Sequence, residues 1–135
     1  MSRTVLFFCP HAAAKSVFAA AFFDRLAAER GLAARADAAG TEPDPVTNPA
    51  VLAALAAEGI DVGGHRPRRV TAEELASAWR VVSLGCDVGG IAPVDRTVER
   101  WDDVPPVSAD LPTAREAIRR RVAALVDQLL AEGDR

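Results

Sequence analysis

The sequence predicts an α/β fold, a three-layer sandwich in which helices cover both faces of a four-stranded parallel sheet. Short, continuous apolar runs alternate along the chain with longer segments of helical periodicity. Such alternation favours parallel strands joined by right-handed helical crossovers. A length of 135 residues with 50% hydrophobic content is enough for one core, so we expect residues 1–135 to form a single domain.

The first half of the chain is predicted to form a strand, a helix and a second strand. Residues 3–8 are a short apolar run that stops at a Cys-Pro pair, as expected of a buried strand. Residues 16–30 place apolar side chains at helical spacing, and the glycine that follows favours a helix end. Residues 33–39 fit a second strand, although alanine has a low strand propensity and the assignment depends on the order of the elements.

The second half is predicted to contain three helices and two further strands. A Thr-Asn-Pro start favours a helix near residues 49–57, and a Thr-x-x-Glu capping box favours a short helix over residues 72–78. Residues 80–84 and 97–101 are predicted strands, and residues 113–130 a long closing helix. The glycine- and proline-rich segments between them are expected to be loops.

Composition narrows the classes of partner. A formal net charge of −3 argues against a nucleic-acid-binding surface, which is normally basic. Two cysteines, no secretory pattern and no apolar run of membrane length predict a cytoplasmic protein without a membrane segment. The two histidines and two cysteines lack the spacing of metal ligands, so we expect no metal and no bound cofactor.

The strongest functional signal is a cysteine at the end of the first strand. Cys9 precedes a short loop that leads into the first helix. A thiol placed there faces free backbone N–H groups and the positive end of the helix dipole, which favour a thiolate and a bound oxyanion. Ligands bind at the carboxyl edge of parallel sheets, and Cys86 follows the third strand at that edge. The alternative for each thiol is a packing or loop residue without a chemical role.

Three motifs carry a resemblance to a known family. The run from Cys9 to Ser16 contains a cysteine, five residues, a basic residue and a serine. It resembles the C-x5-R-S loop of the low-molecular-weight protein tyrosine phosphatases and their arsenate reductase relatives. The "AGT-x-P" stretch at residues 39–43 and the "GID" stretch at residues 59–61 resemble the arsenate reductase branch. The resemblance implies a low-molecular-weight tyrosine phosphatase-like fold with strand order 2-1-3-4.

The resemblance also implies the roles of the loop residues. Cys9 is expected to be the nucleophile, whose thiolate attacks phosphorus or arsenic. Lys15 stands where the family has arginine and supplies positive charge without a bidentate fork. Ser16 is expected to stabilise the thiolate or to cap the first helix. The expected oxyanion-binding residues, among which His11 is either a further donor or only a loop filler, are Pro10, His11, Ala12, Ala13 and Ala14.

Two departures from the family pattern bear on activity. Ala12 stands where the family usually has asparagine and Ala14 where it often has glycine, residues that tolerate a left-handed backbone. Alanine there is expected to add strain or to change the shape of the loop. The family's general acid lies in an Asp-Pro pair beyond a tryptophan, and this chain has two prolines at that point, so Asp102 and Asp103 are the candidate substitute acids.

The thiols limit the redox chemistry. Relatives that discharge through thioredoxin use further cysteines, and this chain has Ala92 where a second Cys-Pro pair often stands. A three-thiol relay is therefore excluded. A disulfide between Cys9 and a resolving Cys86 stays open, as does resolution by an external thiol reductant of the glutathione, mycothiol or thioredoxin type.

These observations leave a leading prediction and two alternatives. The leading prediction is an oxyanion-handling cysteine enzyme that acts on a phosphate ester or on arsenate, with the motifs favouring the reductase. The first alternative is a catalytically impaired relative that binds an oxyanion or a phosphoprotein as a regulatory module. The second is a protein-interaction module, as a monomer or a homodimer. His65 lies in a basic turn with Arg66, which we interpret as solvated surface or as a docking site for an acidic partner.

Overall fold

The computed structural model describes residues 3–85 and 96–133. Its sheet has four parallel strands in the order β2-β1-β3-β4, which confirms the predicted fold class and strand order. The elements in chain order are β1 (Arg3–Cys9), α1 (Lys15–Arg30), β2 (Ala34–Gly40), α2 (Pro49–Ala56), α3 (Ala72–Ser77), β3 (Arg80–Ser83), β4 (Glu99–Arg100) and α4 (Leu111–Gly133).

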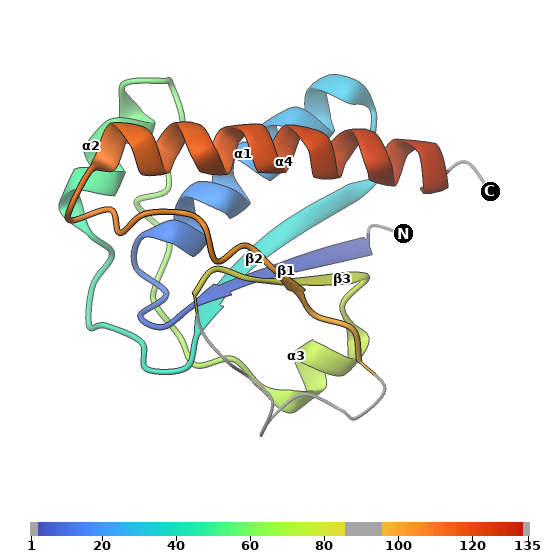
Figure 1. Ribbon diagram of the computed structural model, residues 1–135, viewed down its shortest axis with the longest axis horizontal. Helices are drawn as coiled ribbons and strands as arrows, with labels where there is room; N and C mark the ends of the chain where they lie inside the picture. Colours follow the sequence, from blue (N-terminus) through green and yellow to red (C-terminus); the bar gives the residue numbers. More distant parts are fainter. Residues whose placement is uncertain (1–2, 86–95, 134–135) are drawn as a thin grey trace.

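Helices cover both faces of the sheet (Figure 1), with α1 and α4 on one side and α3 on the other. The alternation of side chains along β1 feeds both layers. Phe7 and Cys9 belong to the large core beneath α1 and α4, whereas Leu6 and Phe8 belong to a smaller core beneath α3. The period of two therefore places the Cys9 side chain on the α1 side of the sheet.

Aromatic packing and a charge cluster fix the helical layer on that side. The Phe7 ring lies 5.9 Å from that of Phe23 in α1 and 5.7 Å from that of Trp101, which follows β4. Glu58, just beyond α2, contacts Arg25 of α1 and Arg119 of α4. Those two guanidinium groups hold the pKa of Glu58 below its usual range, with the Arg119 hydrogen bond as the larger cause. The three helices are thus tied together by apolar burial and by shared charge.

All four strands differ from the predicted ones at one end or both; β2 begins one residue later, at Ala34, and β3 ends one residue earlier, at Ser83. The first two strands each extend one residue further, to Cys9 and Gly40, because β1 and β2 pair in register over their whole length. This pairing overrides the low strand propensity of alanine in β2. β4 covers only Glu99–Arg100, shorter than the predicted residues 97–101, although the N–H of Trp101 still bonds the Ser83 carbonyl at 2.8 Å.

The end of β2 lies directly beside the Cys9 loop. The register pairs Gly40 with Cys9, and the backbone of Gly40 bonds the Arg68 carbonyl and the Val70 N–H on its other side. A Cβ atom on Gly40 would lie 2.7 Å from the carbonyl oxygens of Cys9 and Pro10 and 2.8 Å from the Ala12 nitrogen. All three atoms are backbone, so no side-chain movement can relieve the clash.

Gly40→Ala is therefore expected to lower the free energy of unfolding by about 1–3 kcal/mol, the range that overpacking commonly costs. Urea denaturation measures the change. Gly64→Ala is the matched control, because a Cβ atom there meets nothing within 4 Å. Equal stability of the two variants would show that the Cys9 loop tolerates displacement from β2.

Candidate active site

Cys9 and Ser16 form a buried polar pair at the junction of β1 and α1. Cys9 is 5% exposed as a residue, and its sulfur lies 3.1 Å from the hydroxyl of Ser16, which is fully buried. Helix α1 begins at Lys15 with Ala14 as its N-cap and no side-chain capping bond. The predicted capping role of Ser16 is thus wrong, because its hydroxyl faces the sulfur. When the sulfur is a thiolate, the hydroxyl is its hydrogen-bond donor.

The loop between them is strained at Ala12. Its φ of 55° makes it the one non-glycine residue with a left-handed backbone in the described part of the chain. This conformation costs a residue with a Cβ atom roughly 1–2 kcal/mol. The expectation that alanine adds strain at this position is confirmed. The surrounding structure must hold the loop in this shape.

Four successive carbonyls of the Cys9 loop accept hydrogen bonds from groups outside the loop. Three bonds are backbone contacts with the segment 42–48: Glu42 N–H to Pro10 at 2.7 Å, Asp44 N–H to His11 at 2.9 Å, and Asn48 N–H to Ala13 at 3.0 Å. In a trans peptide the next N–H points opposite to the carbonyl. The N–H groups of the loop are therefore turned away from these partners.

The fourth carbonyl is held by His65, a role that the sequence analysis missed. His65 Nε2 lies 2.9 Å from the Ala12 carbonyl oxygen, and because that oxygen can only accept, Nε2 carries the proton. The predicted solvated turn is wrong for this residue, which is half-buried. The basic neighbours of His65 in sequence suggested an exposed turn. No local pattern indicates a contact with Ala12, which lies 53 positions away.

A cavity of about 310 Å³ opens over Cys9. Lys15 Nζ lies on its wall and donates to the Val104 carbonyl at 2.9 Å, which ties α1 to the loop after β4. The ammonium thus places positive charge at the cavity and has further N–H groups to donate. The lining residues are Cys9, Pro10, His11, Ala13, Ala14, Lys15, Asp44, Asn48, Leu84, Gly85, Pro106, Val107 and Ser108.

The two candidate substitute acids lie away from this cavity. Neither Asp102 nor Asp103 lines it, and each pairs with an arginine: Asp102 with Arg100 at 3.0 Å and Asp103 with Arg121 at 2.6 Å. The Arg121 guanidinium holds the pKa of Asp103 below its usual range. A carboxylate kept ionised in this way is a poor proton donor, so this geometry gives the substitute-acid prediction no support.

Asp44 is the carboxylate that does line the cavity. Its Oδ1 lies 3.3 Å from His11 Nδ1, and the same nitrogen lies 3.1 Å from the Glu42 carbonyl oxygen. The sequence analysis assigned Asp44 no role. The predicted resolving thiol, Cys86, falls outside the described residues, as does Ala92.

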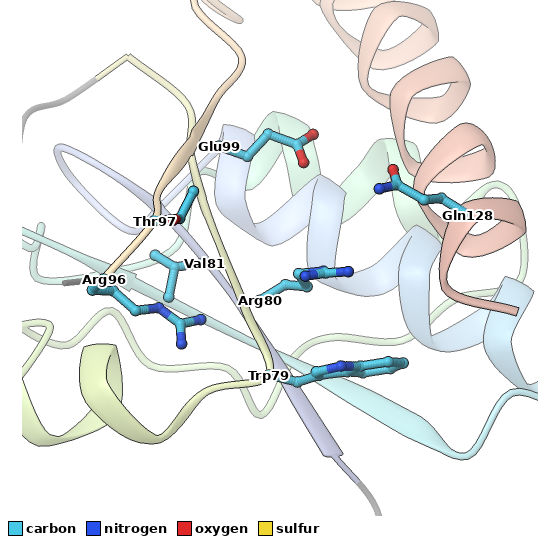
Figure 2. A pocket seen from close by; sticks show the side chains of 7 residues that line it. All are labelled: Trp79, Arg80, Val81, Arg96, Thr97, Glu99 and Gln128. Carbon is cyan, nitrogen blue, oxygen red and sulfur yellow. The ribbon is translucent and has the colours of Figure 1, made fainter. Parts of the chain in front are cut away.

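A second, larger cavity of about 440 Å³ lies at the β3–β4 edge of the sheet near α4 (Figure 2). Arg80 and Arg96 contribute guanidinium groups, and Arg80 pairs with Glu132. None of its lining residues carries a thiol or an imidazole, so its chemistry differs from that of the Cys9 cavity. Those residues are Trp79, Arg80, Val81, Arg96, Thr97, Glu99 and Gln128.

The described residues hold neither a cluster of metal ligands nor a helix suited to a membrane. No set of three or more His, Cys, Asp and Glu side chains gathers there as metal ligands would. Among the helices of the same residues, none is both long enough and apolar enough to cross a membrane. The Cys9 cavity is thus the part of the described structure in which a buried thiol, a cation and a strained backbone loop come together.

Comparison with known proteins agrees with this geometry. The family model "Low molecular weight phosphotyrosine protein phosphatase" matches residues 4–99. The chain belongs to this family. A putative arsenate reductase of Halobacterium salinarum is 28% identical over 127 residues, which is 90% of this chain and 89% of that protein.

Two solved structures extend the comparison. The arsenate reductase of Archaeoglobus fulgidus is 31% identical, covering 91% of this chain and 98% of that one, with a TM-score of 0.71. A thioredoxin-dependent arsenate reductase of Corynebacterium glutamicum is 23% identical, with a TM-score of 0.82, covering 97% of this chain and 63% of that one. Family membership supports a cysteine-based phosphatase or arsenate reductase.

His65→Phe tests whether the imidazole holds the Cys9 loop in this family member. Loss of the bond to the Ala12 carbonyl is expected to lower the free energy of unfolding by about 1 kcal/mol and to weaken phosphate binding. Urea denaturation and phosphate titration by calorimetry measure the two effects. Arg66→Gln, an exposed neighbour in the same turn, is the control. Unchanged phosphate affinity in His65→Phe would show that the loop keeps its shape without the imidazole.

Proposed function

We propose that this protein is an oxyanion-handling cysteine enzyme, in which the thiolate of Cys9 attacks arsenate or a phosphate ester. The observation that carries the proposal is the 3.1 Å contact between the Cys9 sulfur and the Ser16 hydroxyl at the floor of the cavity. A hydroxyl aimed at a sulfur stabilises its anionic form, and the thiolate is the nucleophilic form of cysteine.

The backbone of the loop supplies the oxyanion site in this proposal. The carbonyls of Pro10, His11, Ala12 and Ala13 are bonded on the outside, so the following N–H groups face the other way. A tetrahedral oxyanion seated over Cys9 would accept hydrogen bonds from these groups and from the start of α1. Lys15 would add a positive charge, because its ammonium has donors left after it bonds Val104.

Several features favour arsenate over an aryl phosphate as the substrate. Of the residues that line the cavity in the described structure, His11 carries the sole aromatic ring; the others are small, aliphatic or polar. Lys15 provides no planar fork for the oxygens of a phosphoryl group. The relatives from Halobacterium and Archaeoglobus are named a putative arsenate reductase and an arsenate reductase.

The reductase reaction needs a second thiol. The Cys9 thiolate would form a sulfur–arsenic bond as water leaves arsenate. A second thiol would then attack the Cys9 sulfur, forming a disulfide, while the electron pair of the broken bond reduces arsenic to arsenite. We expect the second thiol to come from Cys86 or from a reductant of the glutathione, mycothiol or thioredoxin type; the Corynebacterium relative is named thioredoxin-dependent.

A regulatory module that binds an oxyanion or a phosphoprotein without turnover is the second candidate. This candidate is favoured by the lysine at position 15. Its ammonium donates to the Val104 carbonyl and lacks the bidentate guanidinium that the family's arginine offers to an oxyanion. Anion binding without turnover is the outcome that separates it from the enzyme.

The first test compares wild type with Cys9→Ser. We expect wild type to reduce arsenate with a thiol reductant or to hydrolyse p-nitrophenyl phosphate, and Cys9→Ser to run at the buffer rate because the nucleophile is gone. Cys86→Ser controls for the other thiol: hydrolysis should persist, and a loss confined to arsenate reduction would identify Cys86 as the resolving residue. Equal rates for wild type and Cys9→Ser on both substrates would contradict the enzyme.

Alkylation then separates binding from turnover. In the Cys86→Ser background, phosphate or arsenate is expected to slow the reaction of Cys9 with iodoacetamide. Protection without turnover would support the regulatory module. Alkylation that is unaffected at millimolar anion would contradict both candidates, since each requires an anion seated over Cys9.

Restoring the family's loop residues is expected to raise hydrolysis. Lys15→Arg supplies the bidentate fork, and Ala12→Asn places at φ 55° a residue that tolerates the left-handed region. The double variant should hydrolyse p-nitrophenyl phosphate about tenfold faster or more, because one oxyanion donor commonly contributes a factor of about 10²–10³. Steady-state kinetics of the double and both single variants measure the gain. No gain would show that the loop is not the limiting part of the site.

A further inference from the structure

We propose that His11 is the catalytic acid and base of the Cys9 reaction and that Asp44 is its positioning residue. This inference rests on the proposed function and adds to it the group that transfers the proton. It replaces the aspartate that the family resemblance implied on the loop after Trp101.

The contacts of His11 fix the position of its proton. Nδ1 lies 3.1 Å from the Glu42 carbonyl oxygen and 3.3 Å from Asp44 Oδ1. Both oxygens accept hydrogen bonds, so Nδ1 carries a hydrogen and donates. Nε2 is then the nitrogen available to substrate, as a base in the neutral ring and as an acid in the protonated ring. The Asp44 carboxylate, by accepting from Nδ1, orients the ring, as the carboxylate does in other carboxylate–imidazole pairs.

The backbone holds Asp44 and Glu42 against His11 independently of the side chains. The Asp44 N–H bonds the His11 carbonyl at 2.9 Å, and the Glu42 N–H bonds the Pro10 carbonyl at 2.7 Å. Segment 42–44 is thus anchored to the loop that carries the histidine. The imidazole and its two acceptors are held by the same pair of loops, which favours one ring orientation.

The position of the pair suits the direction in which a leaving group departs. Cys9 is buried at the floor of the cavity, whereas the side chains of His11 and Asp44 are 58% and 48% exposed. In an in-line displacement the leaving oxygen lies opposite the attacking atom. A leaving group opposite the buried Cys9 sulfur would therefore depart on the solvent side, and His11 carries the exposed imidazole among the described residues that line the cavity.

The other titratable groups of the cavity are already in use. Its described lining contains four such side chains: Cys9, His11, Lys15 and Asp44. Cys9 is the proposed nucleophile. Lys15 is the proposed cation of the oxyanion site, where its N–H groups not bonded to the Val104 carbonyl would hold the anion. Among these four side chains, proton transfer is left to His11 and Asp44. Because Nδ1 of His11 donates to Asp44, Nε2 is the atom left to exchange a proton with substrate.

With a phosphate monoester, His11 would give a proton in the first step and take one back in the second. The Cys9 thiolate forms a sulfur–phosphorus bond while the ester oxygen–phosphorus bond breaks, and that oxygen takes the proton from Nε2 of protonated His11. Water then attacks phosphorus and gives a proton to Nε2, while the sulfur leaves as thiolate and inorganic phosphate is released. With arsenate, an arsenic-bound hydroxyl takes the proton in the first step and leaves as water.

Leaving-group dependence tests the role. Phenolate is a poorer leaving group than p-nitrophenolate and needs the proton more. His11→Gln is expected to lower kcat for phenyl phosphate by about 10²-fold or more, within the range of general acid catalysis, with a much smaller loss for p-nitrophenyl phosphate. Asp44→Asn should give the same pattern more weakly. Glu73→Gln removes an exposed carboxylate on α3 and is the matched control.

If wild type reduces arsenate but does not hydrolyse aryl phosphates, chemical rescue by imidazole tests the role of His11. His11→Gly should reduce arsenate slowly, and added imidazole should restore the rate, whereas Cys9→Ser should not respond. A merely structural histidine would give no such rescue. Urea midpoints show which variants stay folded; if a His11 variant is destabilised, Asp44→Asn provides the kinetic test.

The outcomes separate the inference from the proposed function. Equal losses on both aryl phosphates, or no rescue by imidazole, in a folded variant of an active enzyme would overturn the role of His11 alone. A leaving-group-dependent loss in Asp102→Asn or Asp103→Asn, and not in His11→Gln, would also overturn it. Background rates for both wild type and Cys9→Ser on every substrate would remove the proposed function and this inference together.

Discussion

The anchoring of the Cys9 loop by its carbonyls is the interaction on which the rest of the site depends. Bonds from segment 42–48 and from His65 hold four successive carbonyls on the outside of the loop. This arrangement turns the following N–H groups the other way and keeps Ala12 in the left-handed region. Strain of roughly 1–2 kcal/mol at Ala12 is tolerable because each anchoring bond contributes about 1 kcal/mol.

The Cys9 loop begins at the edge of the sheet where β1 and β2 end. Pairing of β1 with β2 ends at Cys9 and Gly40, so the proposed nucleophile lies at the last paired position of a strand buried on both faces. The absence of a side chain on Gly40 allows the backbones of β2 and the loop to approach closely. The position of the Cys9 thiol is therefore set first by the pairing of β1 with β2 and only then by the loop that follows.

The sequence predicted the fold and the centre of the site because both leave local signals. Apolar runs and capping residues indicated the strands and helices, and Cys9 stands at a strand end, where a parallel sheet binds ligands. His65 and Asp44 were missed because their roles depend on contacts made across the fold. Asp102 and Asp103 were predicted as acids from their proximity to Trp101 in sequence, which does not show that their side chains pair with Arg100 and Arg121.

The proposed proton donor, His11, would tie acid–base chemistry to the same loop as Cys9. A donor on the loop after β4 would approach the nucleophile from a separate segment, and here that loop offers Lys15 a carbonyl from Val104. His11 instead belongs to the loop that carries Cys9, and Asp44 is bonded to that loop through its own backbone. Nucleophile, oxyanion donors and proton donor would then move as one unit. Any displacement of the loop should disturb all three functions at once, whereas a change confined to the loop after β4 should act mainly through the position of the Lys15 ammonium.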